Sequence, residues 1–110
     1  MAAAKVYRHC AVCGVSEKID EIKMVSAQAA DELLGIEDVD ASFVFYYESS
    51  DVVAYSARSM GRINVQIIME KLGGGGHLTM AAAQLKDVSL SDAAEMLKHT
   101  LRKMHEDGDI

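Results

Sequence analysis

The residues best suited to chemistry in this chain are a run of glycines and the histidine after it. The run comprises Gly73, Gly74, Gly75 and Gly76, and His77 comes next. Ordered glycines lose more conformational entropy than other residues, so the run needs a reason, such as positive φ angles or the close approach of a ligand. If His77 opens a short helical turn, the unpaired N–H groups there favour an anion such as phosphate. A flexible tether without a ligand is the alternative.

Two known phosphate loops do not fit this run. A Walker loop requires Lys and then Ser or Thr after the last glycine, but His77 and Leu78 follow Gly76 here. The dinucleotide fingerprint requires its third glycine at position 78, which is Leu78. A phosphate site at this run would therefore have a pattern of its own.

Arg58 is a second residue that could bind phosphate. It lies in the segment YSARS, close to Ser56 and Ser59, and a guanidinium beside hydroxyl groups can hold phosphate oxygens in a fixed orientation. An arginine at the end of a strand can equally be a solvated surface charge. His77 could act as a general acid, a hydrogen-bond donor to phosphate or a metal ligand, and the metal role is the least favoured without nearby carboxylates.

The charge distribution favours a local anion site over a broad nucleic-acid surface. The 110 residues carry a formal net charge of -6, whereas general nucleic-acid binding relies on many Lys and Arg side chains. Between positions 56 and 86, however, the sequence contains four basic residues and one acidic residue, Glu70. The four are Arg58, Arg62, Lys71 and Lys86.

Cys10 and Cys13 form a Cys-x-x-Cys pair, so redox or zinc chemistry must be considered. Further zinc ligands do not follow in any pattern, and redox pairs usually lie at a helix N-terminus. Here the pair lies in the strand-like run KVYRHCAVCGV, in which residues three apart face opposite sides. Two buried thiols are therefore the favoured interpretation, and a redox or zinc protein is the alternative.

The elements that must position these residues are readable from periodicity and turn signals. We expect a strand over the first apolar run, a helix from about Asp20 to Leu34 that ends at Gly35, and a hairpin from ASFVFYY and VVAYSARS joined by ESSD. A second helix should begin after Asn64 and end at Gly73. After the glycines we expect a short helical turn, a strand near positions 83–86 and a last helix capped by Ser89 and Asp92.

These elements predict one α/β domain over residues 1–110. Its layers would be helices flanking a mixed β-sheet of about four to five strands. No apolar run approaches the roughly 20 residues that cross a bilayer, so the default expectation is a cytoplasmic location.

A resemblance to a known family rests on residues 55–85, YSARSMGRINVQIIMEKLGGGGHLTMAAAQL. This segment closely resembles the C-terminal DHH-associated domain of DHH-family phosphoesterases, and the likeness is sharpest to the membrane-anchored bacterial cyclic di-AMP phosphodiesterases. Its signature is Ser-Arg-Ser, a glycine, Ile-Asn-Val and Gly-Gly-Gly-Gly-His. SAQAADELLG and ASFVFYY extend the likeness more loosely.

The resemblance implies a two-lobed enzyme in which a preceding DHH lobe holds two manganese ions. The DHH-associated lobe would close over a cyclic dinucleotide or a short oligonucleotide. By this likeness Arg58 and Ser59 hold a phosphate, and His77 contacts the phosphate near the metals. Gly73 to Gly76 would bring backbone N–H groups to the substrate.

The chain departs from the family because it contains no Asp-His-His stretch. We therefore expect an excised substrate-binding lobe that is inactive alone, has no metal site, and has the DHH lobe of the same polypeptide as its partner. A membrane-anchored parent with this domain on the cytoplasmic side, and a homodimer of the full-length enzyme, are further expectations from the resemblance.

A different function is suggested by related domains in exonucleases of the same superfamily, namely binding of single-stranded nucleic acid. The few aromatic residues and the net acidity count against a stacking groove of that kind.

Overall fold

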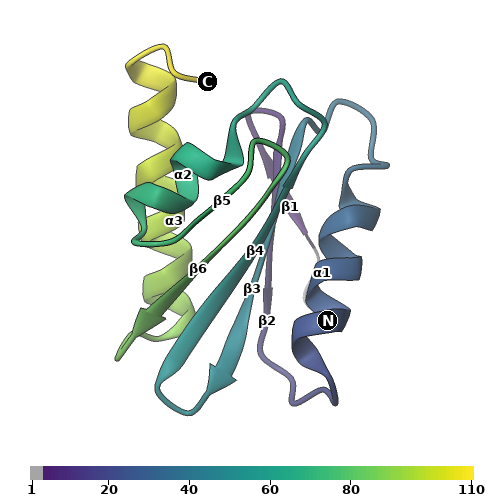
Figure 1. The fold of residues 1–110 in the computed structure, drawn as a ribbon, viewed down its shortest axis with the longest axis vertical. Helices are drawn as coiled ribbons and strands as arrows, with labels where there is room; N and C mark the ends of the chain where they lie inside the picture. Colours follow the sequence, from purple (N-terminus) through teal and green to yellow (C-terminus); the bar gives the residue numbers. More distant parts are fainter. Residues whose placement is uncertain (1–3) are drawn as a thin grey trace.

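The computed structural model describes residues 4–110 and consists of a six-stranded mixed sheet with helices on both faces (Figure 1). The strand order is β1-β2-β3-β4-β6-β5. In chain order the elements are β1 Lys5–Tyr7, β2 Cys10–Val15, α1 Ile22–Leu33, β3 Ala41–Ser49, β4 Val52–Ser59, α2 Val65–Lys71, β5 Gly75–Gly76, β6 Met80–Lys86 and α3 Leu90–Glu106. The α/β prediction is confirmed, and the sheet has one strand more than expected.

Local capping signals set the helix ends as predicted. The side chain of Asn64 accepts hydrogen bonds from the N–H groups of Gln66 and Ile67 at the start of α2. Ser89 and Asp92 form a reciprocal capping box at the start of α3. These side chains satisfy N–H groups that have no partner inside the helix, so the sequence marks both boundaries.

The β3–β4 hairpin is also confirmed, but the single strand expected at the start of the chain is wrong. That run forms two antiparallel strands, β1 and β2, which pair Tyr7 with Cys10. Arg8 and His9 between them both have positive φ angles. Such angles are uncommon without glycine, so the usual sequence signal for a tight hairpin turn was missing.

The segment after the glycines also differs from the prediction. His77 opens no helical turn: its N–H donates to the carbonyl of Met80 at 2.6 Å, and the N–H of Met80 donates back at 3.4 Å. This exchange closes a two-residue hairpin turn between β5 and β6. Gly75 and Gly76 are therefore strand residues, paired with Ala82 and Ala81, and β6 begins at Met80 rather than at position 83.

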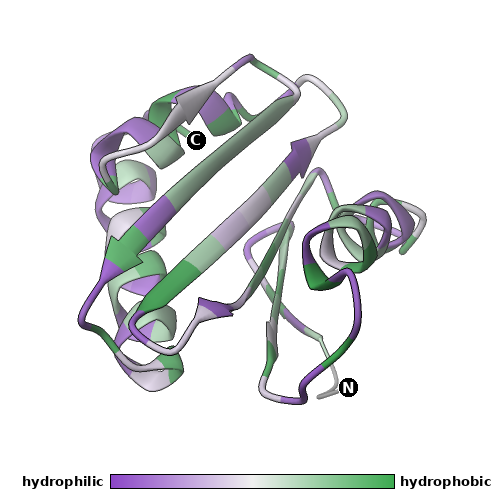
Figure 2. Ribbon diagram, turned by 60° about the horizontal axis from the view of Figure 1, so that its bottom comes forward, coloured by the Kyte–Doolittle hydropathy of each residue, from purple (hydrophilic) through white to green (hydrophobic). Residues whose placement is uncertain are grey.

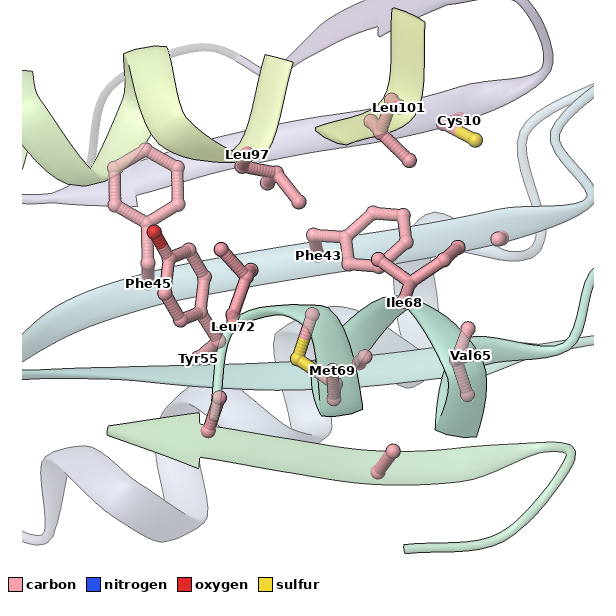
Figure 3. Close-up of a cluster of buried hydrophobic side chains, with 14 of the residues drawn as sticks. Cys10, Phe43, Phe45, Tyr55, Val65, Ile68, Met69, Leu72, Leu97 and Leu101 are labelled. Atoms are coloured by element: carbon pink, nitrogen blue, oxygen red, sulfur yellow. The ribbon is translucent and has the colours of Figure 1, made fainter. Parts of the chain in front are cut away.

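The two faces of the sheet are covered unequally. One face packs against α2 and α3 in a core that includes Phe43, Tyr55, Ile68 and Leu97 (Figure 3). The hydroxyl of Tyr55 donates to the carbonyl of Ala93 in α3 at 2.6 Å. We call this side the covered face.

On the other face the one helix within residues 4–110 is α1, which packs mainly on β3 and β4. Its cluster is smaller and includes Val44, Tyr46 and Ala30. Along β6, the residues that point to this side are exposed, whereas Ala81 and Ala83 point into the core. We call the exposed residues of β6 on this side, namely Met80, Ala82, Gln84 and Lys86, the open face. Figure 2 shows β6 and α1 in one view of the sheet.

No helix within residues 4–110 is long and apolar enough to cross a membrane.

Candidate functional site

Arg58 lies near the end of β4 and points to the same side of the sheet as α1. Its Nε lies 3.2 Å from Oδ1 of Asp31 in α1, and its Nη1 donates to the carbonyl of Ala57 at 2.9 Å. The side chain is only 13% exposed. The guanidinium is thus held against the sheet rather than extended into solvent.

Ser59 follows Arg58 but faces the opposite side. Its hydroxyl donates to the carbonyl of Ile63 at 2.6 Å and accepts from the N–H of Gly61 at 2.9 Å. Because successive residues of a strand alternate between faces, the structure does not bring this hydroxyl to the guanidinium of Arg58. In this conformation Ser59 stabilises the loop from β4 to α2.

Three of the four glycines are required by the fold. Gly73 has a φ of 87° and ends α2 by donating to the carbonyl of Glu70, and Gly74 donates to that of Met69. A Cβ at Gly74 would overlap the backbone of β6 at Ala82 and Ala83. Gly76 combines a φ of 148° with a similar overlap. The flexible-tether alternative is wrong for this run, because each glycine has a defined place.

Gly75 is the exception within the run. A Cβ there would meet no atom within 4 Å, and its φ angle is not in the positive range that favours glycine. Nothing in the packing of residues 4–110 therefore explains why this position lacks a side chain. Close approach of a bound molecule to the backbone would explain a glycine at this position.

His77 lies at the same end of the sheet as Arg58. Arg58 pairs with Met80 across β4 and β6, and Met80 exchanges hydrogen bonds with His77. The N–H of Ser59 also donates to the carbonyl of Thr79 in the hairpin turn, at 3.0 Å. The structure thus places the arginine and the histidine at one end of the sheet, on either side of Met80, although they are 19 positions apart. The His77 side chain is exposed.

The backbone N–H of His77 is already used by Met80, so a helix N-terminus does not provide an anion site there. Side chains that could bind an anion at this end of the sheet include Arg58 and His77, and also the exposed Arg62 in the loop after β4.

A groove of about 310 Å³ lies between α1 and the open face, and Arg58, Gly75 and His77 are not among the residues that line it. Its lining includes Ala54, Ser56 and Ala82 on the sheet, Gly73 and Gly74 beside β5, and polar side chains at its rim. The small residues leave room above the strands. The polar set is Lys23, Tyr46, Glu48 and Gln84.

Lys23 and Tyr46 are groove residues that the sequence did not single out. Burial raises the pKa of the Tyr46 phenol, and the nearby Glu48 raises it further, while a hydrogen bond with Ser56 opposes the shift. Tyr46 therefore keeps its proton at neutral pH and can donate a hydrogen bond. Only the packing of α1 on the sheet places Lys23 in this groove, so no local pattern could have found it.

The two cysteines do not form a site. Cys10 belongs to the core of the covered face and Cys13 to the cluster under α1. The prediction that they are buried on opposite sides is confirmed. No group of three or more His, Cys, Asp or Glu side chains that could hold a metal occurs among residues 4–110.

Comparison with known proteins assigns the family. Residues 9–106 match the DHHA1 domain. The chain belongs to the DHHA1 domain family. The elements that carry Arg58, Asp31 and the glycine hairpin all lie inside the matched region.

Relatives of this DHHA1 domain include larger phosphodiesterases. The cyclic-di-AMP phosphodiesterase PdeA of Listeria monocytogenes is 55% identical over 74 residues, which cover 67% of this chain and 11% of that protein. The cyclic-di-AMP phosphodiesterase GdpP of Bacillus subtilis is 47% identical over 100 residues, which cover 89% of this chain and 15% of that protein. The DHHA1 domain thus spans less than a fifth of the length of either relative.

A solved structure shares the fold. The exopolyphosphatase-related protein from Bacteroides fragilis superposes with a TM-score of 0.79 at 21% identity, and the match covers 92% of this chain and 31% of that one. The arrangement of sheet and helices is therefore one that part of a larger solved protein also adopts.

Proposed function

We propose that this DHHA1 domain is the substrate-binding lobe of a manganese-dependent phosphodiesterase that hydrolyses cyclic di-AMP or short linear dinucleotides, and that it is inactive without the lobe that holds the metals. The names of the two relatives support the substrate class. The observation that carries the proposal is the placement of Arg58 and His77 at one end of the sheet, next to a glycine edge with an unexplained opening at Gly75.

Each part of this site would have a distinct role in binding. The guanidinium of Arg58 would form charge-assisted hydrogen bonds with phosphate oxygens. His77, exposed at the hairpin turn, would donate a further hydrogen bond to the same phosphate. At Gly75 the absence of a side chain would let the substrate approach the backbone of β5 closely. The groove beside α1 would provide space for the remainder of the nucleotide.

The manganese ions in this proposal would be bound outside this domain. Two-metal hydrolysis needs carboxylate and histidine ligands, and no suitable group of them occurs within residues 4–110. We therefore assign the metals, and the chemical step, to a DHH lobe of the same polypeptide. This domain would bind and orient the substrate.

Calorimetric titration of the 110-residue chain with cyclic di-AMP tests the proposal. We expect Arg58→Ala and His77→Ala each to weaken binding by tens of fold, because loss of a charge-assisted hydrogen bond commonly costs about 2 kcal/mol or more. Arg102→Ala is the matched control: Arg102 is an exposed arginine on α3, which covers the other face, so its loss should leave affinity unchanged.

The same titration separates the alternative function. Affinity that rises steadily with the length of a single-stranded oligonucleotide would favour the nucleic-acid-binding module, whereas a plateau at the dinucleotide supports the proposal. Equal affinity of the wild type and both variants for cyclic di-AMP would remove Arg58 and His77 from the site. In the polypeptide that includes the DHH lobe, we expect the same two substitutions to reduce turnover by tens of fold.

A rate assay tests the claim of inactivity. The 110-residue chain with manganese should not hydrolyse cyclic di-AMP measurably. A rate comparable to that of the polypeptide with its DHH lobe would contradict the division of labour between the lobes.

A further inference from the structure

The guanidinium of Arg58 is held on two sides by groups of the protein. Nη1 donates to the carbonyl of Ala57 at 2.9 Å, and Nε lies 3.2 Å from Oδ1 of Asp31. The contact with Asp31 is an ion pair without the alignment of a hydrogen bond. Within residues 4–110, Nη2 has no hydrogen-bond acceptor. The orientation therefore leaves Nη2 available to an incoming anion.

Asp31 is placed beside Arg58 by a separate anchor in the sheet. Ser42 of β3 pairs directly with Arg58 of β4, and its buried hydroxyl donates to the carbonyl of Ala30 in α1. Ala30 is fully buried and immediately precedes Asp31. This hydrogen bond fixes the last turns of α1 over the strand pair, so Asp31 lies opposite the guanidinium.

We propose that Asp31 is a positioning residue for Arg58 that orients the guanidinium towards the substrate phosphate. The inference rests on the proposed function, since it assigns Arg58 as the phosphate ligand. Arginine has many rotamers, and ordering such a side chain during binding costs affinity. Asp31 would order the Arg58 side chain before the substrate binds, because it contacts Nε and leaves Nη2 free. Less side-chain entropy would then be lost during binding.

The ion pair joins a largely buried cation to an exposed acid. The side chain of Arg58 is 13% exposed and that of Asp31 is 64% exposed, so solvent screens the carboxylate and we expect Asp31→Asn to cost less than about 1 kcal/mol of stability. Removing Asp31 should therefore leave the fold intact.

Two roles of Asp31 predict opposite effects on affinity. A carboxylate that acted only as a nearby negative charge would repel the phosphate, so Asp31→Asn would tighten binding. A carboxylate that orients Arg58 makes the same substitution weaken binding. The sign of the change in affinity for cyclic di-AMP thus decides between them.

The first experiment follows the Arg58 side chain itself, without any substrate. In ¹⁵N relaxation of the 110-residue chain, the Nε–H group of Arg58 should be ordered in the wild type and in Glu32→Gln, and more mobile in Asp31→Asn. Glu32 is the matched control, because it is an exposed acid at the adjacent position of α1. Unchanged order in Asp31→Asn would overturn the proposal.

The second experiment measures binding of cyclic di-AMP to the same chain. We expect Asp31→Asn to weaken affinity by three- to tenfold, Asp31→Glu to recover part of the loss, and Glu32→Gln to have no effect. In the Arg58→Ala background Asp31→Asn should cause no further loss, because its partner is gone. The melting temperature of the Glu32 variant should match the wild type, and those of the Asp31 variants should lie within a few degrees of it.

The outcomes separate this inference from the proposed function. If Arg58→Ala weakens binding and Asp31→Asn does not, or tightens it, the positioning role is wrong and the proposed function stands. If Arg58→Ala has no effect, the proposed function fails at this site and the inference fails with it. If Asp31→Asn weakens binding equally with and without Arg58, Asp31 acts by another route and the inference is wrong.

Discussion

The covered face and the side of the sheet that bears α1 are built from different residues. Two helices cover the first with large apolar side chains, among them Phe43, Ile68 and Leu97. On the second, α1 covers only part of the sheet, and small or polar residues such as Ser56 and Gln84 line a groove. Arg58 points to this second side. The larger apolar core thus lies on the covered face, and the proposed binding site lies on the side where fewer large side chains pack.

The largest expected change in the free energy of unfolding comes from a substitution in the core of the covered face. Leu97 is fully buried in α3, so Leu97→Ala should lower the free energy of unfolding by roughly 2–5 kcal/mol. Gln84→Ala on the open face should change it by less than about 0.5 kcal/mol. Urea unfolding of the two variants measures this contrast. Similar losses at both positions would contradict the unequal division of stability.

The next effect separates two neighbouring glycines. A Cβ at Gly74 overlaps the backbone of β6, so Gly74→Ala should destabilise the chain by roughly 1–3 kcal/mol. Gly75 has open space where a Cβ would project, so Gly75→Ala should leave stability near the wild type.

Gly75→Ala should nevertheless weaken the binding of cyclic di-AMP, since a ligand would lose its close approach to β5. Thermal unfolding together with calorimetric titration checks both halves of this prediction. A Gly75→Ala chain with normal stability and normal affinity would show that no ligand approaches that residue.

The smallest effect is a dependence of stability on pH. Burial, and to a lesser extent the charge of Asp40, raises the pKa of the Cys10 thiol from 9.0 to about 12. Above pH 9 the unfolded chain releases a proton that the folded chain retains, so this stability is present below pH 9 and is lost as the pH rises. The loss should be about 1 kcal/mol at pH 10.

Cysteine substitutions sharpen the same comparison between the two faces. Cys10→Ala should flatten the fall in unfolding free energy between pH 9 and 11 more than Cys13→Ala does, because Cys10 lies in the larger core and Cys13 in the smaller cluster. Denaturant unfolding at several pH values provides the measurement. If the unfolding free energy of Cys10→Ala fell with pH as steeply as that of the wild type, Cys10 would not be the source of this pH dependence.

Much of the fold was predictable because its signals are local. Asn64, Ser89 and Asp92 cap helices with their own side chains, and the hydrophobic period marked α1 and α3. The β1–β2 hairpin was missed because Arg8 and His9 adopt positive φ angles without the usual glycine. The predicted start of β6, near position 83, lies three residues after its actual start at Met80. The pairing of β6 with β5 and β4 is not encoded in its own composition.

The candidate site was only partly predictable. Arg58 and His77 were named from their residue types, and the sheet does bring them to one end. Ser59 was also named, but strand alternation turns its hydroxyl to the opposite face, where the loop to α2 uses it. Asp31 was not named, because it meets Arg58 only through the packing of a helix 27 positions earlier in the chain.

The helix caps and the β3–β4 hairpin could be predicted from the amino-acid order, since each depends on side chains a few residues apart. The roles of the four glycines depend instead on which strands and helices pack beside them in the folded chain. Pairing of β5 with β6 requires glycine at positions 74 and 76, and the end of α2 requires it at position 73. Gly75 differs because, among residues 4–110, no atom lies within 4 Å of the position that its Cβ would take, and only a folded chain shows where its neighbours lie.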